Sequence, residues 1–149
     1  MKAIAYLQFN GNAQEALEFY ETALQGTVKK VSFGALPQNP SAPLSLEEQG
    51  MIMESRIEFS ENILMISDVL PSMQAVTGEV TKGTNVIISV IDGEQETNKL
   101  YFENLSKDGT IIMPISSVPW SSSFGMLIDK FGVMWKFNSD ASQFLNSLV

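Results

Sequence analysis

The stretch from Ala5 to Gly26, AYLQFNGNAQEALEFYETALQG, decides the fold, because the chain repeats its pattern from Ile87 to Gly109, IISVIDGEQETNKLYFENLSKDG. Each copy has a short apolar strand, a turn that contains a glycine, and a helix that carries two adjacent aromatic residues. A shift of 82 positions places Phe19-Tyr20 on Tyr101-Phe102, and strand-like residues follow each helix. The sequence therefore predicts a duplicated β-α-β unit.

The ends of the two helices are also repeated. Asn12 with Glu15 has the spacing of a capping box, and Asp92 with Gln95 repeats that cap. Gly26 and Gly109 are placed to end the helices. Apolar residues recur at helical spacing in both segments, so we expect the aromatic pairs to pack in the core.

Length and composition narrow the class of protein. A chain of 149 residues that is 44% hydrophobic can bury one substantial core, or two small ones that share an interface. Cysteine is absent, which excludes disulfides, thiolate nucleophiles and zinc sites with cysteine ligands. The net charge of −8 and the scattered basic residues argue against binding to nucleic acid.

The N-terminal apolar stretch is interrupted by Gln8 and Asn10. It is too short for a signal peptide or a membrane span, so we expect a cytoplasmic protein that does not bind membranes.

The segments between and after the two helices complete the predicted architecture. Residues 28–34, 51–59 and 63–68 have the composition of strands in the first half, and 110–113, 124–129 and 133–138 in the second. Each half then has the order β-α-β-β-β in an α+β fold. We expect one domain, 1–149, with a first module at 1–70, a linker at 71–83 and a second module at 84–149.

One helix covers only one face of a small sheet, so the other face is left for a ligand or a partner. Two such sheets side by side would form a curved trough, which is the expected binding site. Alternation along the strands assigns residues to this uncovered side. The residues on the uncovered side are Ile4, Tyr6, Gln8, Ile52, Glu54, Arg56, Glu58, Asn85, Ile87 and Ser89. The residues that should face the helices are Ala3, Ala5, Leu7, Phe9, Met53, Ser55, Ile57, Phe59, Val86, Ile88 and Val90.

Three segments carry a family resemblance: AYLQFNGNAQEALEFY, MIMESRIEFSENILMISD and, most specifically, PWSSSFGMLIDKFGVMWKFN. Together they resemble the PhnB-like branch of the glyoxalase/bleomycin-resistance (vicinal oxygen chelate, VOC) superfamily. The resemblance covers nearly the whole chain and implies tandem βαβββ modules. It specifies no activity, because the fold serves lyases, isomerases, dioxygenases, antibiotic-modifying enzymes and metal-free drug-binding proteins.

The resemblance also implies a divalent metal held by His or Gln on first strands and Glu on last strands. In this chain those positions fall at Ile4 or Tyr6, Asn85, Ile66 or Ser67, and Lys136, and the chain has no histidine. A lysine next to a divalent cation would repel it. We therefore expect no metal and no cofactor.

Two functions of different class remain open. The first is metal-independent binding of a small molecule, with hydrogen bonds and aromatic walls supplied by Tyr6, Gln8, Glu54, Arg56, Ser89, Trp120 and Trp135. The alternative is a metal-dependent lyase or isomerase of glyoxalase type, with Gln8, Glu54 and Asp68 or Glu58 around the cation. Instead of contacting a ligand, Trp135 could equally be buried. The charged residues within 54–58 could form a solvated strip instead of a binding site. We also expect a homodimer, because the sheets expose edge strands.

Overall fold

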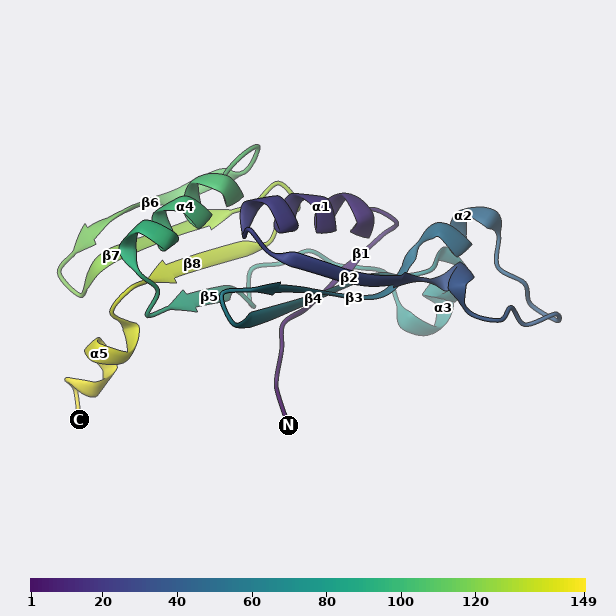
Figure 1. Cartoon of the computed structure of the whole chain (residues 1–149), viewed down its shortest axis with the longest axis horizontal. Helices are drawn as coiled ribbons and strands as arrows, with labels where there is room; N and C mark the ends of the chain where they lie inside the picture. The colour runs from purple at the N-terminus through teal and green to yellow at the C-terminus, as the bar shows by residue number, and fades with distance from the viewer. The chain divides into compact units, whose positions relative to one another are not determined.

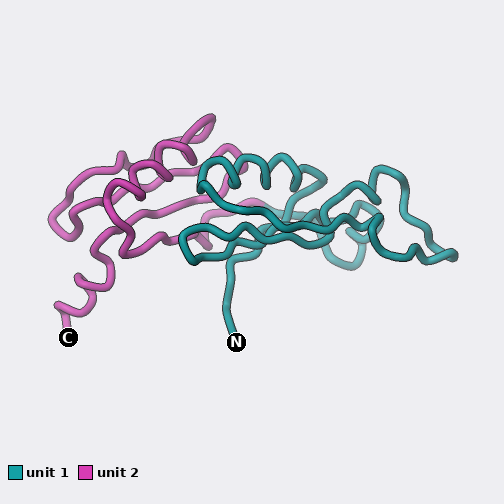
Figure 2. Tube along the Cα trace, viewed as in Figure 1, with its two compact units in different colours: residues 1–81 teal, residues 82–149 magenta.

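The structure is a computed structural model that describes residues 1–149. The chain divides into two compact units, residues 1–81 and residues 82–149 (Figure 2). Each unit contains one four-stranded mixed sheet that is not closed into a barrel. No helix combines the length and the apolar character needed to cross a bilayer.

The first unit has the predicted order β-α-β-β-β, with additional short helices. Its strands are β1 (Tyr6–Phe9), β2 (Thr27–Ser32), β3 (Ile52–Phe59) and β4 (Asn62–Asp68), in the sheet order β1-β4-β3-β2 (Figure 1). Its helices are α1 (Ala13–Ala23), η1 (Phe33–Ala35), α2 (Leu46–Gly50), η2 (Pro71–Met73) and α3 (Gln74–Thr77). β1 pairs with β4 in parallel, and β3 pairs with β2 and β4 in antiparallel fashion.

The second unit repeats this topology. Its strands are β5 (Ile88–Ile91), β6 (Thr110–Val118), β7 (Ser121–Ile128) and β8 (Met134–Asn138), in the order β5-β8-β7-β6. Its helices are α4 (Gln95–Leu105) and α5 (Ala141–Asn146). β6 and β7 are longer than the predicted strands 110–113 and 124–129 and form a hairpin, because β6 continues through Pro114 to Val118 and β7 begins at Ser121. Pro114 is tolerated there because β6 is an edge strand.

The longest helix of each unit packs on one face of its own sheet. In the first unit α1 packs against β3 and β4, where Ile57, Leu64 and Ile66 are almost completely buried. In the second unit α4 packs against β7, and Leu127, Trp135 and Phe137 are fully buried. The two predicted aromatic pairs contribute Tyr20, Tyr101 and Phe102 to these cores, while Phe19 is half-buried.

The helix ends differ from the prediction. The Asn12 side chain makes no capping hydrogen bond, and the Asp68 carboxylate at the end of β4 accepts the Gly11 and Ala13 backbone N–H groups instead (2.9 and 3.0 Å). Asp92 accepts hydrogen bonds from Ser142 of α5 and does not cap α4. In both cases a carboxylate from another segment accepts backbone N–H groups at the start of a helix, which a local sequence pattern cannot show.

The two predicted helix-ending glycines serve a different purpose. The left-handed backbone lies one residue earlier, at Gln25 (φ 50°) and Asp108 (φ 57°). A Cβ on Gly26 would lie 2.7 Å from Ile57 Cγ2, and one on Gly109 would lie 2.4 Å from the Ile128 carbonyl oxygen. Glycine is required there because the chain passes directly against β3 and β7.

Four predicted face assignments were wrong. Ala3 and Ala5, which we expected to face the helix, are exposed, because they precede β1, which begins at Tyr6. Ile52 is buried, because the pairing of β2 and β3 has an irregularity at Val31/Ser32 that interrupts the alternation. Val86 is 76% exposed, because β5 begins two residues later. Leu100, one of the apolar residues that recur at helical spacing in α4, is also exposed.

Candidate functional site

The uncovered face of the first sheet brings four of the predicted site residues together. Tyr6 lies beside Met65 in the register of β1 and β4, and Met65 lies beside Arg56 in the register of β4 and β3. Gln8 is two residues from Tyr6, and Glu54 is two residues from Arg56, so each shares the face of its neighbour. We call this surface the first-unit open face, which consists of Tyr6, Gln8, Glu54, Arg56, Met65 and Ser67.

A network of three interacting side chains lies at its centre. The Tyr6 hydroxyl interacts with the side chains of Ser67 and Glu54. Burial raises the pKa of the Tyr6 phenol above its ordinary value of 10.0; the hydrogen bond from Ser67 lowers it in part, and the hydrogen bond to Glu54 and its charge raise it. At neutral pH the phenol therefore keeps its proton and can act as a hydrogen-bond donor.

The network is open to solvent on one side. Tyr6 is 43% exposed and Glu54 is exposed, whereas Ser67 beneath them is buried. The Gln8 side chain, beside Ser67 in the register, makes no hydrogen bond within the chain. The face thus offers a carboxylate, a phenol and an amide for hydrogen bonds with a ligand.

Arg56 is already paired. Its Nε lies 2.8 Å from Glu58 Oε1, and both side chains are about half-exposed (44% and 46%). An ion pair this exposed contributes little to stability. It does reduce the positive charge that Arg56 can offer to an anionic ligand.

The second unit separates the remaining predicted site residues. Ser89 lies on the uncovered side of its sheet, next to Lys136 in the register of β5 and β8. Trp120 lies in the turn between β6 and β7 and is 41% exposed. Trp135 is fully buried on the α4 side, where its indole N–H donates to Asp129 Oδ2 at 2.9 Å, so it presents no surface to a ligand.

The residues do not fit a divalent metal. No group of three His, Cys, Asp or Glu side chains in the chain could hold one. Both carboxylate oxygens of Asp68 accept backbone N–H groups, from Gly11, Ala13 and Ile52, so this residue connects β4 to α1 and β3. In the second unit Lys136 lies between Ser89 and Met126 with no carboxylate partner.

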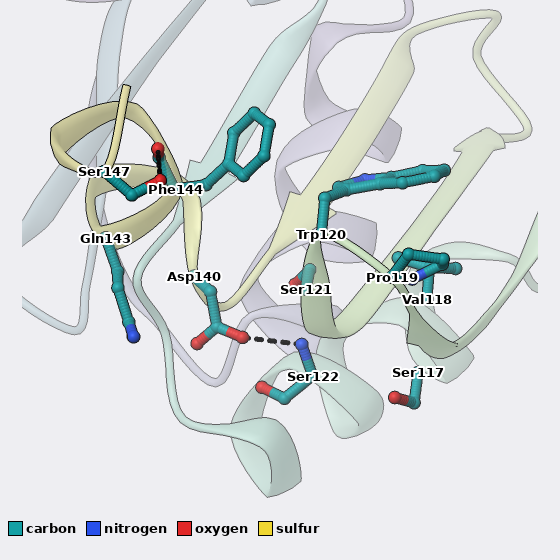
Figure 3. A pocket seen from close by; sticks show the side chains of 10 residues that line it. All are labelled: Ser117, Val118, Pro119, Trp120, Ser121, Ser122, Asp140, Gln143, Phe144 and Ser147. Carbon is teal, nitrogen blue, oxygen red and sulfur yellow. Dashed lines mark hydrogen bonds between the residues drawn. The ribbon is translucent and has the colours of Figure 1, made fainter. Parts of the chain in front are cut away.

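Sequence reasoning missed one pocket. It has a volume of about 310 Å³ and lies between the turn of β6 and β7 and helix α5 (Figure 3). Besides Trp120, its lining includes Asp140, Gln143 and Phe144. The signal that predicts α5 is Ser139-Asp140 before an amphipathic segment, because Asp is a favoured residue at a helix start.

Comparison with known proteins identifies the family of the chain. The family model of 3-demethylubiquinone-9 3-methyltransferase matches residues 1–138. The chain belongs to this family. Members of the family need not share one activity, because a shared fold does not fix the chemistry of a site.

Three relatives illustrate the similarity. Protein YjdN of Escherichia coli is 31% identical over 141 residues, which cover 89% of this chain and 91% of that protein. Protein PA1353 of Pseudomonas aeruginosa is 30% identical, with a TM-score of 0.76 over 93% of this chain and 96% of that chain. A Bacillus cereus structure described as a putative 3-demethylubiquinone-9 3-methyltransferase, PhnB protein, is 26% identical, with a TM-score of 0.66 over 93% and 98%.

More distant solved structures have the same fold, which agrees with the fold that the resemblance implied. A glyoxalase-related enzyme and a fosfomycin resistance protein share the fold at 14% and 9% sequence identity. At such identities the likeness concerns the fold alone.

Proposed function

We propose that the protein binds a small polar organic molecule on the first-unit open face, without a metal ion. The observation that carries the proposal is the exposed Tyr6 phenol, which interacts with Ser67 and Glu54 on the sheet face opposite α1. Asp68 shows the contrast, because its carboxylate is fully used by backbone donors of the fold. The exposed carboxylate of Glu54 has acceptor capacity left for a ligand.

The chemistry of the face indicates the kind of ligand. Glu54 accepts hydrogen bonds from hydroxyl or amine groups, and the Gln8 amide both donates and accepts. The apolar side chain of Met65 lies beside Tyr6 and adapts to irregular shapes. A molecule with several hydroxyl or amino groups and a small apolar part matches these groups best.

The absence of suitable metal ligands separates this proposal from glyoxalase-type chemistry. A metal-assisted lyase or isomerase needs a cation with open coordination positions to stabilise an enolate or alkoxide. Gln8 and Glu54 lie on the open face, but Asp68 belongs to the opposite face and Glu58 pairs with Arg56. These four side chains therefore do not form one ligand set.

A thermal-shift screen tests the proposal. Purified protein is mixed with a library of small polar metabolites, with and without a chelator, because a ligand that binds the folded state raises the unfolding temperature by mass action. We expect at least one compound to stabilise the protein equally with and without the chelator. Stabilisation that disappears with chelator and returns with added manganese or zinc would instead support the metal-dependent alternative.

Matched variants locate the binding. Glu54→Gln and Tyr6→Phe change the network without changing its size, and Glu103→Gln on the exposed side of α4 is the control. The response to the compound should be lost in the first two variants and kept in the control. An unchanged response in Glu54→Gln and Tyr6→Phe would place the ligand elsewhere.

A further inference from the structure

The pocket of the second unit has the size of a small-molecule site. Its volume of about 310 Å³ is at the lower end of the range for ligand pockets, which is about 300–1,000 Å³. All of its lining residues lie between Ser117 and Ser147, so the pocket belongs to the second unit alone. It is distinct from the first-unit open face.

Two aromatic side chains form its apolar part. Trp120 comes from the β6–β7 turn and Phe144 from α5, and both rings stand above Asp140 in Figure 3. Each residue remains about two-fifths exposed (41% and 42%). Trp120 is oriented by an edge-to-face contact with Phe124, with a centroid distance of 5.6 Å. Indole and phenyl faces attract cations as well as apolar groups.

Asp140 is the only charged residue that lines the pocket. Its Oδ2 accepts the Ser122 backbone N–H at 2.6 Å, which fixes the carboxylate, whereas its Oδ1 accepts no hydrogen bond. No lysine or arginine lines the pocket to neutralise this charge. The chain as a whole is also acidic, with a net charge of −8, which favours the approach of cations.

Some of the other polar side chains in the pocket form hydrogen bonds within the chain, and others do not. The Ser121 and Ser147 hydroxyls donate to backbone carbonyl oxygens, of Ser123 and Phe144 respectively. The hydroxyls of Ser117 and Ser122 and the side-chain amide of Gln143 make no hydrogen bond within the chain. These three groups are available to a ligand that also reaches Asp140.

We propose that this pocket binds a small organic ammonium ion, whose positive charge pairs with Asp140 and whose apolar part packs on Trp120 and Phe144. The combination of one fixed carboxylate and two exposed rings selects for charge and for an apolar body together. A neutral molecule of the same shape lacks the charge, and a carboxylic acid is repelled by Asp140.

Three probes of similar shape test this selectivity: 2-phenylethylammonium, 2-phenylethanol and 3-phenylpropionate. Isothermal titration calorimetry and tryptophan fluorescence measure the dissociation constants in buffer of low ionic strength, since salt screens the charge. We expect the ammonium ion to bind about tenfold more tightly than the alcohol, and the carboxylate not to bind. Equal binding of ammonium and alcohol, or no saturable binding of the ammonium ion at millimolar concentration, would overturn the proposal.

Variants of the pocket distinguish it from a general affinity of an acidic protein for cations. Asp140→Asn removes the charge but keeps an oxygen that can accept the Ser122 N–H, so the fold should persist, as circular dichroism can check. Asp140→Asn should remove the preference for the ammonium ion. Asp108→Asn, which changes a surface carboxylate outside the pocket, should leave this preference unchanged. Trp120→Leu should weaken the binding of the ammonium ion and the binding of the alcohol to a similar extent. Unchanged binding in Asp140→Asn, or an equal loss in Asp108→Asn, would contradict the proposal.

Discussion

Tyr6 is the residue on which the proposed binding depends most. Its phenol is 43% exposed on the first-unit open face and interacts with the side chains of Ser67 and Glu54. Burial and the neighbouring carboxylate both favour the neutral phenol, so the pKa is raised in the folded protein. In the folded protein, Tyr6 then keeps its proton at a pH at which Tyr6 of the unfolded chain has lost it.

This shift makes stability depend on pH at the alkaline end. Because the folded pKa lies above the unfolded value of about 10, the contribution of Tyr6 is complete below pH 10 and is lost as the pH rises through the folded pKa. The chain has three tyrosines. Subtracting the ultraviolet titration curve of Tyr6→Phe from that of the wild type isolates the titration of Tyr6. We expect its midpoint above 10, and a lower midpoint in Glu54→Gln. A midpoint that does not move in Glu54→Gln would show that the carboxylate does not act on the phenol.

Strand β3 shows which features of an element the sequence predicts. Its alternation is reproduced from Met53 to Glu58, with Ser55 and Ile57 buried and Glu54, Arg56 and Glu58 exposed. The prediction was wrong at Ile52, where a pairing irregularity with β2 interrupts the period. Periodicity holds within a regular ladder and does not reveal where the ladder becomes irregular.

The two sides of β3 should respond differently to truncation. Ile57 is fully buried under α1, so Ile57→Ala should lower the free energy of unfolding by about 2–5 kcal/mol through lost burial and a cavity. Glu58 is half-exposed and pairs only with Arg56, so Glu58→Ala should cost at most about 1 kcal/mol. Urea unfolding measures both. Similar costs for the two variants would mean that the register is shifted by one residue.

At the scale of the whole molecule, the duplication determines most of the fold. Two βαβββ modules could be predicted from the repeated aromatic pairs, the glycines after each helix and the strand-like segments. Asp68 and Asp92, which bind backbone groups about 50 or more positions away, could not be recognised from local patterns. The pocket of the second unit also escaped prediction, because it requires α5 to lie near the β6–β7 turn.

Exposed edges support the expectation of a homodimer. β6 is an edge strand of its sheet and carries three exposed apolar residues in a row, Ile111, Ile112 and Met113. Such an edge invites pairing unless another surface covers it. Light scattering should therefore give twice the chain mass of 16.4 kDa. A monomer at all micromolar concentrations would contradict this expectation.

The most direct test of the account is metal analysis combined with ligand response in the same sample. Elemental analysis of purified protein should find no stoichiometric zinc, nickel or manganese, because the chain has no histidine and no group of three suitable side chains. A compound that stabilises the protein through Glu54 should do so equally before and after dialysis against a chelator. About one metal ion per chain, removed by the chelator together with the ligand response, would contradict metal-free binding on the first-unit open face.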